Sequence, residues 1–223
     1  MAPAGSPPAL NPDMVGYYAR RAPDYDDVYR IPARAPELAA LRAWLAEAVR
    51  GRDVLEVAAG TGHWTAVAAT TARRVVATDV NAAMLAHAAA RGLGPHVSLR
   101  PADAFDLPLL PDAPNTAMAH LWWSHLRRGE RGRFLAHLRS RVQPNARLLM
   151  LDECDHPDIA PPASRHDAEG NGYEARRLAD GEVFAILKNY PDDAELRADL
   201  ALACDAIEIR RGAYFWAVQA VFR

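Results

Sequence analysis

A strand, a glycine turn and a helix follow one another within residues 53–72, and this unit constrains the fold more than any other feature. Residues 53–58 (DVLEVA) form a short apolar run that is typical of a buried strand. Gly60 and Gly62 come next, and a helix is predicted from His63 onward. Because glycine has no Cβ, backbone at such a turn can approach a ligand closely. The unit therefore predicts one step of a parallel α/β sheet with a ligand site at its turn.

The alternation of strand and helix continues along the chain. Apolar residues at helical spacing and capping residues mark the helices, and short apolar runs mark the strands. Strands that alternate with helices form βαβ units, which predicts a doubly wound, mostly parallel sheet. The predicted helices cover residues 36–50, 82–91 and 130–142, and the predicted strands cover residues 73–80, 96–100, 115–122 and 146–153.

The chain ends in two further strands, residues 205–210 and 214–222. Only the residues Arg211, Gly212 and Ala213 separate them. Parallel strands need a crossover of about a dozen or more residues, so this pair must be antiparallel. The prediction is a seven-stranded sheet whose last strand is antiparallel.

The remaining segments lie at the N-terminus and after the fifth strand. Residues 1–12 are rich in proline, lack the pattern of a signal peptide and are expected to be disordered. A single domain is expected to cover residues 13–223. The other predicted elements are a short helix (13–22), an aromatic turn (25–29), a loop (154–171), a hairpin (173–178 with 182–188) and a helix that starts at Pro191.

The overall charge and the cysteines exclude several classes of protein. There are 26 basic and 28 acidic residues, a balance that gives no sign of nucleic-acid or membrane binding. No apolar run is long enough to span a bilayer. Cys154 and Cys204 match no metal-binding spacing and suggest a reducing cytoplasm. Lys188 is the only lysine, which, with the abundant alanine and proline, suggests a GC-rich bacterial genome.

The residues around the glycine turn favour a cationic ligand over a dinucleotide. A dinucleotide site needs a small residue where this chain has Thr65. It also places a pyrophosphate at the helix N-terminus, where Glu56 would repel it. The same carboxylate suits S-adenosylmethionine, which carries an ammonium group and a sulfonium and has no phosphate.

Carboxylates also follow the next two strands. Asp79 ends the second strand and falls where a ribose-binding acid is expected. Met84 can pack on adenine. Asp103 follows the third strand and can accept a hydrogen bond from the adenine amine. Ala104 and Phe105 would offer backbone groups and an apolar wall beside it. Each residue alone could be an ordinary turn or capping residue, and it is their order and spacing that favours a cofactor site.

In these motifs the chain resembles the class I (Rossmann-like) S-adenosylmethionine-dependent methyltransferases of small-molecule type. The resemblance covers roughly residues 54–223 and rests on VLEVAAGTG, ATDVNAAML, PADAFDLP, the WWSHL segment and the closing hairpin. It implies a sheet of order 3-2-1-4-5-7-6 with helices on both faces. It also implies an S-adenosyl-L-methionine cofactor that leaves as S-adenosyl-L-homocysteine, with no metal. Ala58 stands where the family often has glycine.

The same resemblance implies a lid and an acceptor cover. Residues 13–34 (YYARRAPDYDDVY at their centre) are similar to the N-terminal segment whose tyrosines close over the ligands. Residues 154–190 correspond to an insertion that covers the acceptor. Packing of a helix on the core is an alternative role for the tyrosines. The cofactor residues so predicted are Tyr18, Tyr25, Glu56, Ala58, Gly60, Gly62, Trp64, Thr65, Asp79, Val80, Met84, Asp103, Ala104, Phe105 and Leu121.

Candidate acceptor residues follow the fourth and fifth strands. His125 is the candidate general base or hydrogen-bond partner, and a surface capping role is the alternative. Trp122 and Trp123 could wall the pocket, although one of them is expected in the core. His166, Tyr173 and Arg176 could contact an acceptor, and the arginine suits an anionic one. A position on a solvated strand face is the alternative for Arg176 and is slightly favoured.

Several alternatives stay open from the sequence. A metal site made of Asp152, His156 and His166 is conceivable, but its spacing matches no known pattern. The chain could methylate protein or RNA, although it shows no basic stripe. It could also bind the cofactor without transferring a methyl group. The favoured expectation is a cytoplasmic enzyme of secondary metabolism, a monomer or homodimer that binds neither nucleic acid nor membrane.

Overall fold

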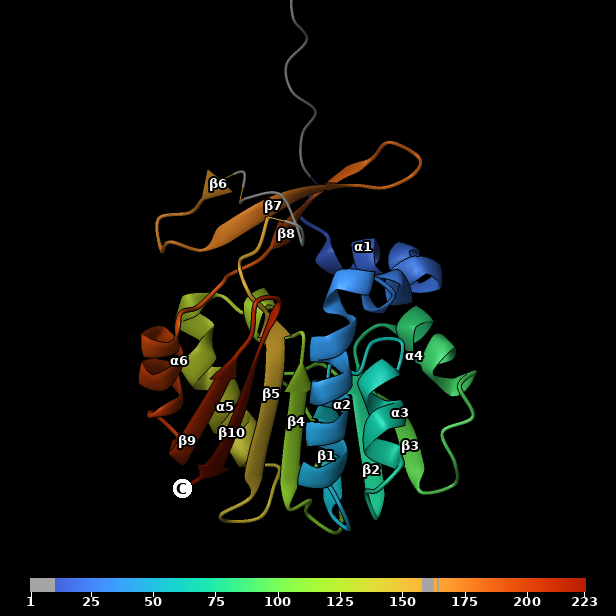
Figure 1. Ribbon diagram of the computed structural model, residues 1–223, viewed down its shortest axis with the longest axis vertical. Coiled ribbons are helices and arrows are strands. Elements are labelled where there is room, and N and C mark those ends of the chain that lie inside the picture. The colour runs from blue at the N-terminus through green and yellow to red at the C-terminus, as the bar shows by residue number, and fades with distance from the viewer. Residues whose placement is uncertain (1–10, 158–162, 164) are drawn as a thin grey trace, which may run out of the picture.

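The centre of the molecule is a seven-stranded sheet in a computed structural model that describes residues 11–157, 163 and 165–223. Its strand order is β3-β2-β1-β4-β5-β10-β9, which confirms the predicted topology (Figure 1). Strand β10 runs antiparallel to both β5 and β9, and β1 to β5 are parallel to one another. The strands are β1 (Asp53–Val57), β2 (Arg74–Asp79), β3 (Val97–Pro101), β4 (Thr116–His120), β5 (Arg147–Glu153), β9 (Cys204–Arg211) and β10 (Phe215–Phe222).

Helices cover both faces of this sheet, as predicted. In Figure 1, α2 and α3 lie in front of the sheet and α5 lies behind it. Side-chain caps fix two of the helix starts, since Asn81 accepts from the N–H of Ala83 and Asp192 from that of Glu195. The helices are α2 (Ala35–Ala48), α3 (His63–Ala69), α4 (Ala82–Ala89), α5 (Arg131–Arg139) and α6 (Asp193–Leu200).

The core consists of two apolar layers, one on each face of the sheet. Successive side chains of a strand point to opposite faces, so β5 contributes to both layers. Leu148 and Met150 pack in the layer that holds the apolar side chains of α5 and α6. Leu149 and Leu151 pack in the layer of α2 and α3. Burial on both faces explains why the central strands are continuous apolar runs rather than alternating ones.

The N-terminal segment lies over the carboxyl ends of the parallel strands (Figure 1). It consists of helix α1 (Met14–Arg21) and the 3₁₀ segments η1 (Ala22–Tyr29) and η2 (Pro32–Arg34). Asp13 caps α1 by accepting from the N–H of Gly16. The predicted helix and the predicted aromatic turn are both present.

A small antiparallel sheet of order β6-β7-β8 lies above the same edge of the large sheet (Figure 1). Strands β7 (Gly172–Arg177) and β8 (Val183–Leu187) form the predicted hairpin. The sequence did not predict β6 (Arg165–His166), because two residues carry no pattern and the strand exists only through its pairing with β7. Asn11 pairs with Phe184 of β8 although it falls in the segment expected to be disordered. Residues 1–10 lie outside the described residues.

Strand β4 ends at His120, earlier than predicted. Leu121 has φ of 53°, a left-handed conformation that breaks the strand direction. Two 3₁₀ segments follow, η3 (Trp123–His125) and η4 (Arg128–Glu130). This change of direction brings residues 121–125 to the carboxyl edge of the sheet. Among the described residues, no helix is long and apolar enough to cross a membrane.

Candidate functional site

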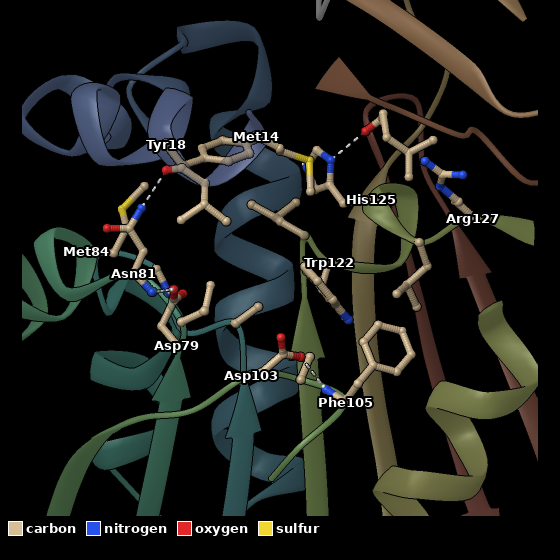
Figure 2. A pocket seen from close by; sticks show the side chains of 18 of the residues that line it. Met14, Tyr18, Asp79, Asn81, Met84, Asp103, Phe105, Trp122, His125 and Arg127 are labelled. Carbon is tan, nitrogen blue, oxygen red and sulfur yellow. Dashed lines mark hydrogen bonds between the residues drawn. The ribbon is translucent and has the colours of Figure 1, made fainter. Parts of the chain in front are cut away.

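A cavity of about 450 Å³ opens at the carboxyl ends of the parallel strands. The loops after β1, β2, β3 and β4 form its floor, and α1, η1 and β8 also line it (Figure 2). This is the edge at which open α/β sheets hold their ligands. The predicted cofactor residues that line the cavity are Tyr18, Tyr25, Ala58, Gly60, Asp79, Val80, Met84, Asp103, Ala104, Phe105 and Leu121.

Asp79 is held at the end of β2 by two backbone groups. The N–H of Gly60 donates to Oδ2 and the N–H of Asn81 donates to Oδ1, each at 2.8 Å. Burial raises the pKa of this carboxyl, and the two N–H groups oppose that shift. The Gly60 turn and Asp79 are therefore one unit, and the carboxylate faces the cavity with its remaining lone pairs (Figure 2).

Asp103 lies across the cavity from the residues of α1. Its Oδ1 accepts from the N–H of Phe105 at 2.7 Å, which folds the chain after β3 into a short turn. Phe105 is fixed from behind by Phe134 and by Arg133, whose guanidinium lies 4.2 Å from the ring centre. The turn presents a carboxylate and an aromatic ring side by side, as Figure 2 shows.

Glu56 lies beneath the glycine turn, outside the cavity lining. Its side chain is buried, and Oε2 accepts from the hydroxyl of Thr65 at 2.6 Å. Burial raises the pKa of Glu56 to about 8, and the negative charge of Asp79 adds to the shift. The predicted residues Gly62, Trp64 and Thr65 likewise support the turn without lining the cavity.

His125 is buried at the meeting point of η3, α1 and β8. Its Nδ1 lies 2.7 Å from the carbonyl oxygen of Leu187 and its Nε2 lies 3.0 Å from the hydroxyl of Tyr18. A carbonyl only accepts, so Nδ1 carries the proton and Nε2 accepts from Tyr18. Burial, together with the charge of Lys188, lowers the pKa of His125 to about 3. The alternative of an exposed capping histidine is wrong, because only 8% of the residue's surface is exposed.

Polar contacts connect the N-terminal segment to the loops after β1 and β2 and to the end of α4. Asn81 donates from Nδ2 to the carbonyl of Val15 at 3.0 Å. Asp26 accepts from the Thr61 hydroxyl at 2.6 Å and pairs with Arg91. Asn81 also caps α4, and its contact with Val15 depends on a residue far away in the chain.

The predicted acceptor residues are divided between several places. Trp122 and Tyr173 line the cavity, whereas Trp123 is fully buried in the core beneath Arg131. His166 is exposed on β6, outside the cavity lining. Arg176 lines a second cavity, which also touches Tyr18 and His125.

A metal centre receives no support from the described residues. They contain no group of three or more histidine, cysteine, aspartate or glutamate side chains that could hold an ion. Asp152 instead accepts from Ser124 at 2.9 Å and 3.0 Å and contacts Lys188 at 3.3 Å.

The fold and the site together define a class. A doubly wound sheet of this order, with a glycine turn after β1, a carboxylate at the end of β2 and another after β3, is typical of Rossmann-like domains that bind a nucleoside-containing ligand. The cavity residues fit a cationic ligand of this kind, because Asp79 and Asp103 both face it and Gly60 places no side chain in it.

Comparison with known proteins identifies the family. Residues 54–145 match the model of a family described as methyltransferase domain. A structure of DhpI with SAM and HEP is 31% identical, with a TM-score of 0.76 over 92% of this chain and 94% of that chain. A DhpI–SAH structure is also 31% identical, with a TM-score of 0.73 over 92% of this chain and 93% of that chain. The chain therefore belongs to the class I S-adenosylmethionine-dependent methyltransferase family.

One further protein is similar in sequence, and another shares the fold alone. A probable S-adenosylmethionine-dependent methyltransferase from Mycolicibacterium smegmatis is 39% identical over 150 residues, which are 65% of this chain and 53% of that protein. The chain thus spans about half the length of that relative. The PH0226 protein from Pyrococcus horikoshii OT3 shares the fold at 16% identity, with a TM-score of 0.72 over 93% of this chain and 99% of that chain.

Proposed function

We propose that the protein transfers the methyl group of S-adenosylmethionine to an oxygen or nitrogen atom of a small molecule. The observation that carries the proposal is the pair of carboxylates, Asp79 and Asp103, in one cavity at the carboxyl ends of the strands. Such a cavity attracts a nucleoside joined to a cationic amino acid and repels the phosphates of a dinucleotide. The likeness to structures solved with SAM and SAH supports the proposal.

The cavity residues have separate roles in this proposal. Asp79 accepts hydrogen bonds from the ribose hydroxyls, and Asp103 accepts from the adenine amine. Met84 and Phe105 pack against the adenine ring. When it is bound, S-adenosylmethionine supplies an electrophilic methyl group on its sulfonium sulfur. Fixing an acceptor in line with that group can lower the barrier by roughly 7–11 kcal/mol.

His125 orients the acceptor in this proposal and does not act as a strong base. With a pKa of about 3 the imidazole stays neutral near pH 7, so its Nε2 is an acceptor of hydrogen bonds. A hydroxyl or amine of the acceptor takes the place of the Tyr18 hydroxyl on this nitrogen. A proton that the acceptor loses then passes to solvent, because His125 does not retain it.

The elements that surround the cavity support a small acceptor. Helix α1 and strand β8 both line the cavity, and Trp122 and Tyr173 narrow it further. A folded protein or a nucleic acid would have to displace these elements. We propose that residues 13–34 act as the lid and residues 154–190 as the acceptor cover. We also propose that the reaction belongs to bacterial secondary metabolism and takes place in the cytoplasm, in keeping with two free cysteines.

Calorimetry tests the cofactor site. We expect S-adenosylmethionine and S-adenosylhomocysteine to bind, and NAD not to bind comparably. Asp79→Ala should weaken binding by about 1.5–3 kcal/mol, the range for hydrogen bonds to a charged group. Asp205→Ala is the matched control, because Asp205 is exposed on β9 and pairs only with Arg223 among the described residues. Unchanged affinity in Asp79→Ala would show that the ribose lies elsewhere.

Turnover distinguishes an enzyme from a protein that only binds the cofactor. The protein would be incubated with methyl-labelled S-adenosylmethionine and a panel of small acceptors, with a protein mixture and an RNA mixture as separate samples. We expect label in a small-molecule product. Label in protein or RNA alone would contradict the assignment of the acceptor, and release of no label with any acceptor would contradict methyl transfer.

A further inference from the structure

A second cavity, of about 550 Å³, meets the first one at Tyr18 and His125. Both side chains line both cavities, as do Tyr25 and Leu121. The two cavities therefore share one wall, and that wall contains the histidine proposed to orient the acceptor. We call the second cavity the basic chamber, for the side chains that line it.

The two cavities differ in charge. The first is lined by the acids Asp79, Asp103 and Glu130 and by two arginines. In the basic chamber the cations outnumber the anions, which are Asp27 and Glu153. The cations that line the basic chamber are Arg21, Arg34, Arg176, Arg177 and Lys188. A cationic ligand suits the first cavity, and an anionic one suits the second.

Lys188 is already satisfied by its neighbours. Its Nζ contacts Ser124 Oγ at 2.9 Å, Glu153 Oε2 at 3.0 Å and Asp152 Oδ1 at 3.3 Å. An ammonium has three donors, so these contacts use its full capacity. Lys188 therefore contributes positive charge to the chamber but has no free hydrogen-bond donor to offer a ligand.

Two arginines of the chamber keep donors available: Arg34, which is buried, and Arg176, whose side chain is 25% exposed. Arg34 is 2% exposed and makes only long contacts, 3.3 Å to Glu153 and 3.5 Å to the Val28 carbonyl. Its Nε is buried and has no hydrogen-bond partner among the described residues. Arg176 uses Nε and Nη2 on Glu174, at 2.8 Å and 2.7 Å. A buried donor without an acceptor is destabilising, and an oxyanion would supply the acceptor.

We propose that the methyl acceptor carries an ionised oxyanion, a carboxylate or a phosphate-type group, and that the basic chamber binds it through Arg176 and Arg34. This inference rests on the proposed function, since it names the class of molecule that the enzyme methylates. The planar guanidinium fork matches the geometry of such anions. A cationic acceptor would meet like charges here, and a neutral one would leave the arginine donors without partners.

Lys188 offers a site-specific reporter of the chamber because it is the only lysine in the chain. Protein labelled with [¹⁵N]lysine gives one backbone amide signal, from a residue that lines the basic chamber. The protein is first saturated with S-adenosylhomocysteine, and binding is verified by calorimetry. Sodium acetate, inorganic phosphate or acetamide is then added at constant ionic strength.

We expect acetate or phosphate to shift the Lys188 signal saturably, and acetamide, the neutral counterpart of acetate, to leave it in place. Response to acetate alone indicates a carboxylate, and response to phosphate alone indicates a phosphate-type group. Arg176→Gln should weaken the effective anion about tenfold, as the loss of one charge-assisted hydrogen bond implies. Arg50→Gln makes the same change in charge at an exposed position outside both cavities and should have no effect.

The possible failures separate the inference from the function. If S-adenosylhomocysteine binds but neither anion shifts the signal saturably, the basic chamber is no anion site and the methyltransferase proposal stands. The same conclusion follows if acetamide acts as strongly as acetate, or if Arg176→Gln binds the anion as well as the unaltered protein does. If S-adenosylhomocysteine itself does not bind, the proposed function fails as well.

Discussion

Glu56 shows how burial changes the chemistry of a single side chain. With a pKa of about 8, the folded protein holds a proton on this carboxyl near pH 7, whereas the unfolded chain does not. Folding therefore takes up a proton. The stability that this proton uptake by Glu56 provides is fully present below the ordinary pKa of a glutamate and is lost as the pH rises towards about 8.

We predict that the free energy of unfolding of the unaltered protein falls between pH 7 and pH 8. The Glu56→Gln variant should lack the part of this fall that comes from Glu56, because glutamine does not titrate. The limiting slope for one proton is about 1.4 kcal/mol per pH unit. Urea denaturation of both proteins across this range measures the difference. The buried histidines His120 and His125 have lowered pKa values and act in the opposite sense, but only below about pH 6.5. Equal slopes in the two proteins would refute the prediction.

The types of residue at the site could be predicted from the sequence, because the charge and size of a side chain indicate which ligand it can bind. Asp79 and Asp103 follow strands that end at one edge, and that edge is where ligands bind. The contact between Tyr18 and His125 was not predictable as a pair, because the two residues lie on separate elements and meet only in the folded chain. Whether a buried acid such as Glu56 faces the cavity also depends on packing.

At the scale of elements, the start of α3 is set by Gly62, which packs against α4. Gly60 and Gly62 both have positive φ, 57° and 78°, so a side chain at either is strained. A Cβ on Gly60 would meet nothing within 4 Å, whereas one on Gly62 would lie 2.8 Å from the Cβ of Ala88. A side chain at either glycine would strain the backbone, but only a side chain at Gly62 would also clash with α4. Substitutions at the two positions therefore distinguish the two effects.

We predict that Gly62→Ala destabilises the protein more than Gly60→Ala. The left-handed conformation alone costs about 1–2 kcal/mol, and the clash with α4 adds about 1–3 kcal/mol more. Chemical denaturation of the two variants under the same conditions gives the comparison. If Gly60→Ala is the less stable of the two, then contact with α4 does not decide the role of Gly62.

Elements with a strong local pattern were predicted well, and those that depend on a partner were not. The strands of the large sheet are apolar runs, and their helices carry caps such as Asn81 and Asp192. By contrast, β6 has only two residues and exists through its pairing with β7. The end of β4 at the left-handed Leu121 is likewise set by the surrounding structure, since leucine has no preference for that conformation.

For the molecule as a whole, Lys188 joins the small sheet to the large one. It follows β8, and its ammonium pairs with Asp152 and Glu153 of β5. All three groups are almost fully buried. Removing the ammonium leaves Asp152 with no cation within salt-bridge distance among the described residues, and leaves Glu153 with Arg34 at 3.3 Å.

We predict that Lys188→Met lowers the free energy of unfolding by about 3–5 kcal/mol. Arg210→Met, at an exposed position on β9, should change it by less than about 0.5 kcal/mol. Denaturant titrations followed by circular dichroism measure both. A loss for Lys188→Met no larger than that of the control would show that the cluster does not hold the two sheets together.

The sequence by itself determined the order of elements, the doubly wound sheet with its antiparallel end and the acidic ligand edge. These follow from local apolar runs, from the length of each connection and from residue types at strand ends, all of which act over short stretches of chain. Only the tertiary structure decided which side chains share a cavity. The cations of the basic chamber come from α1, η2, β7 and the residue after β8, and no short-range pattern relates positions that lie so far apart in the chain.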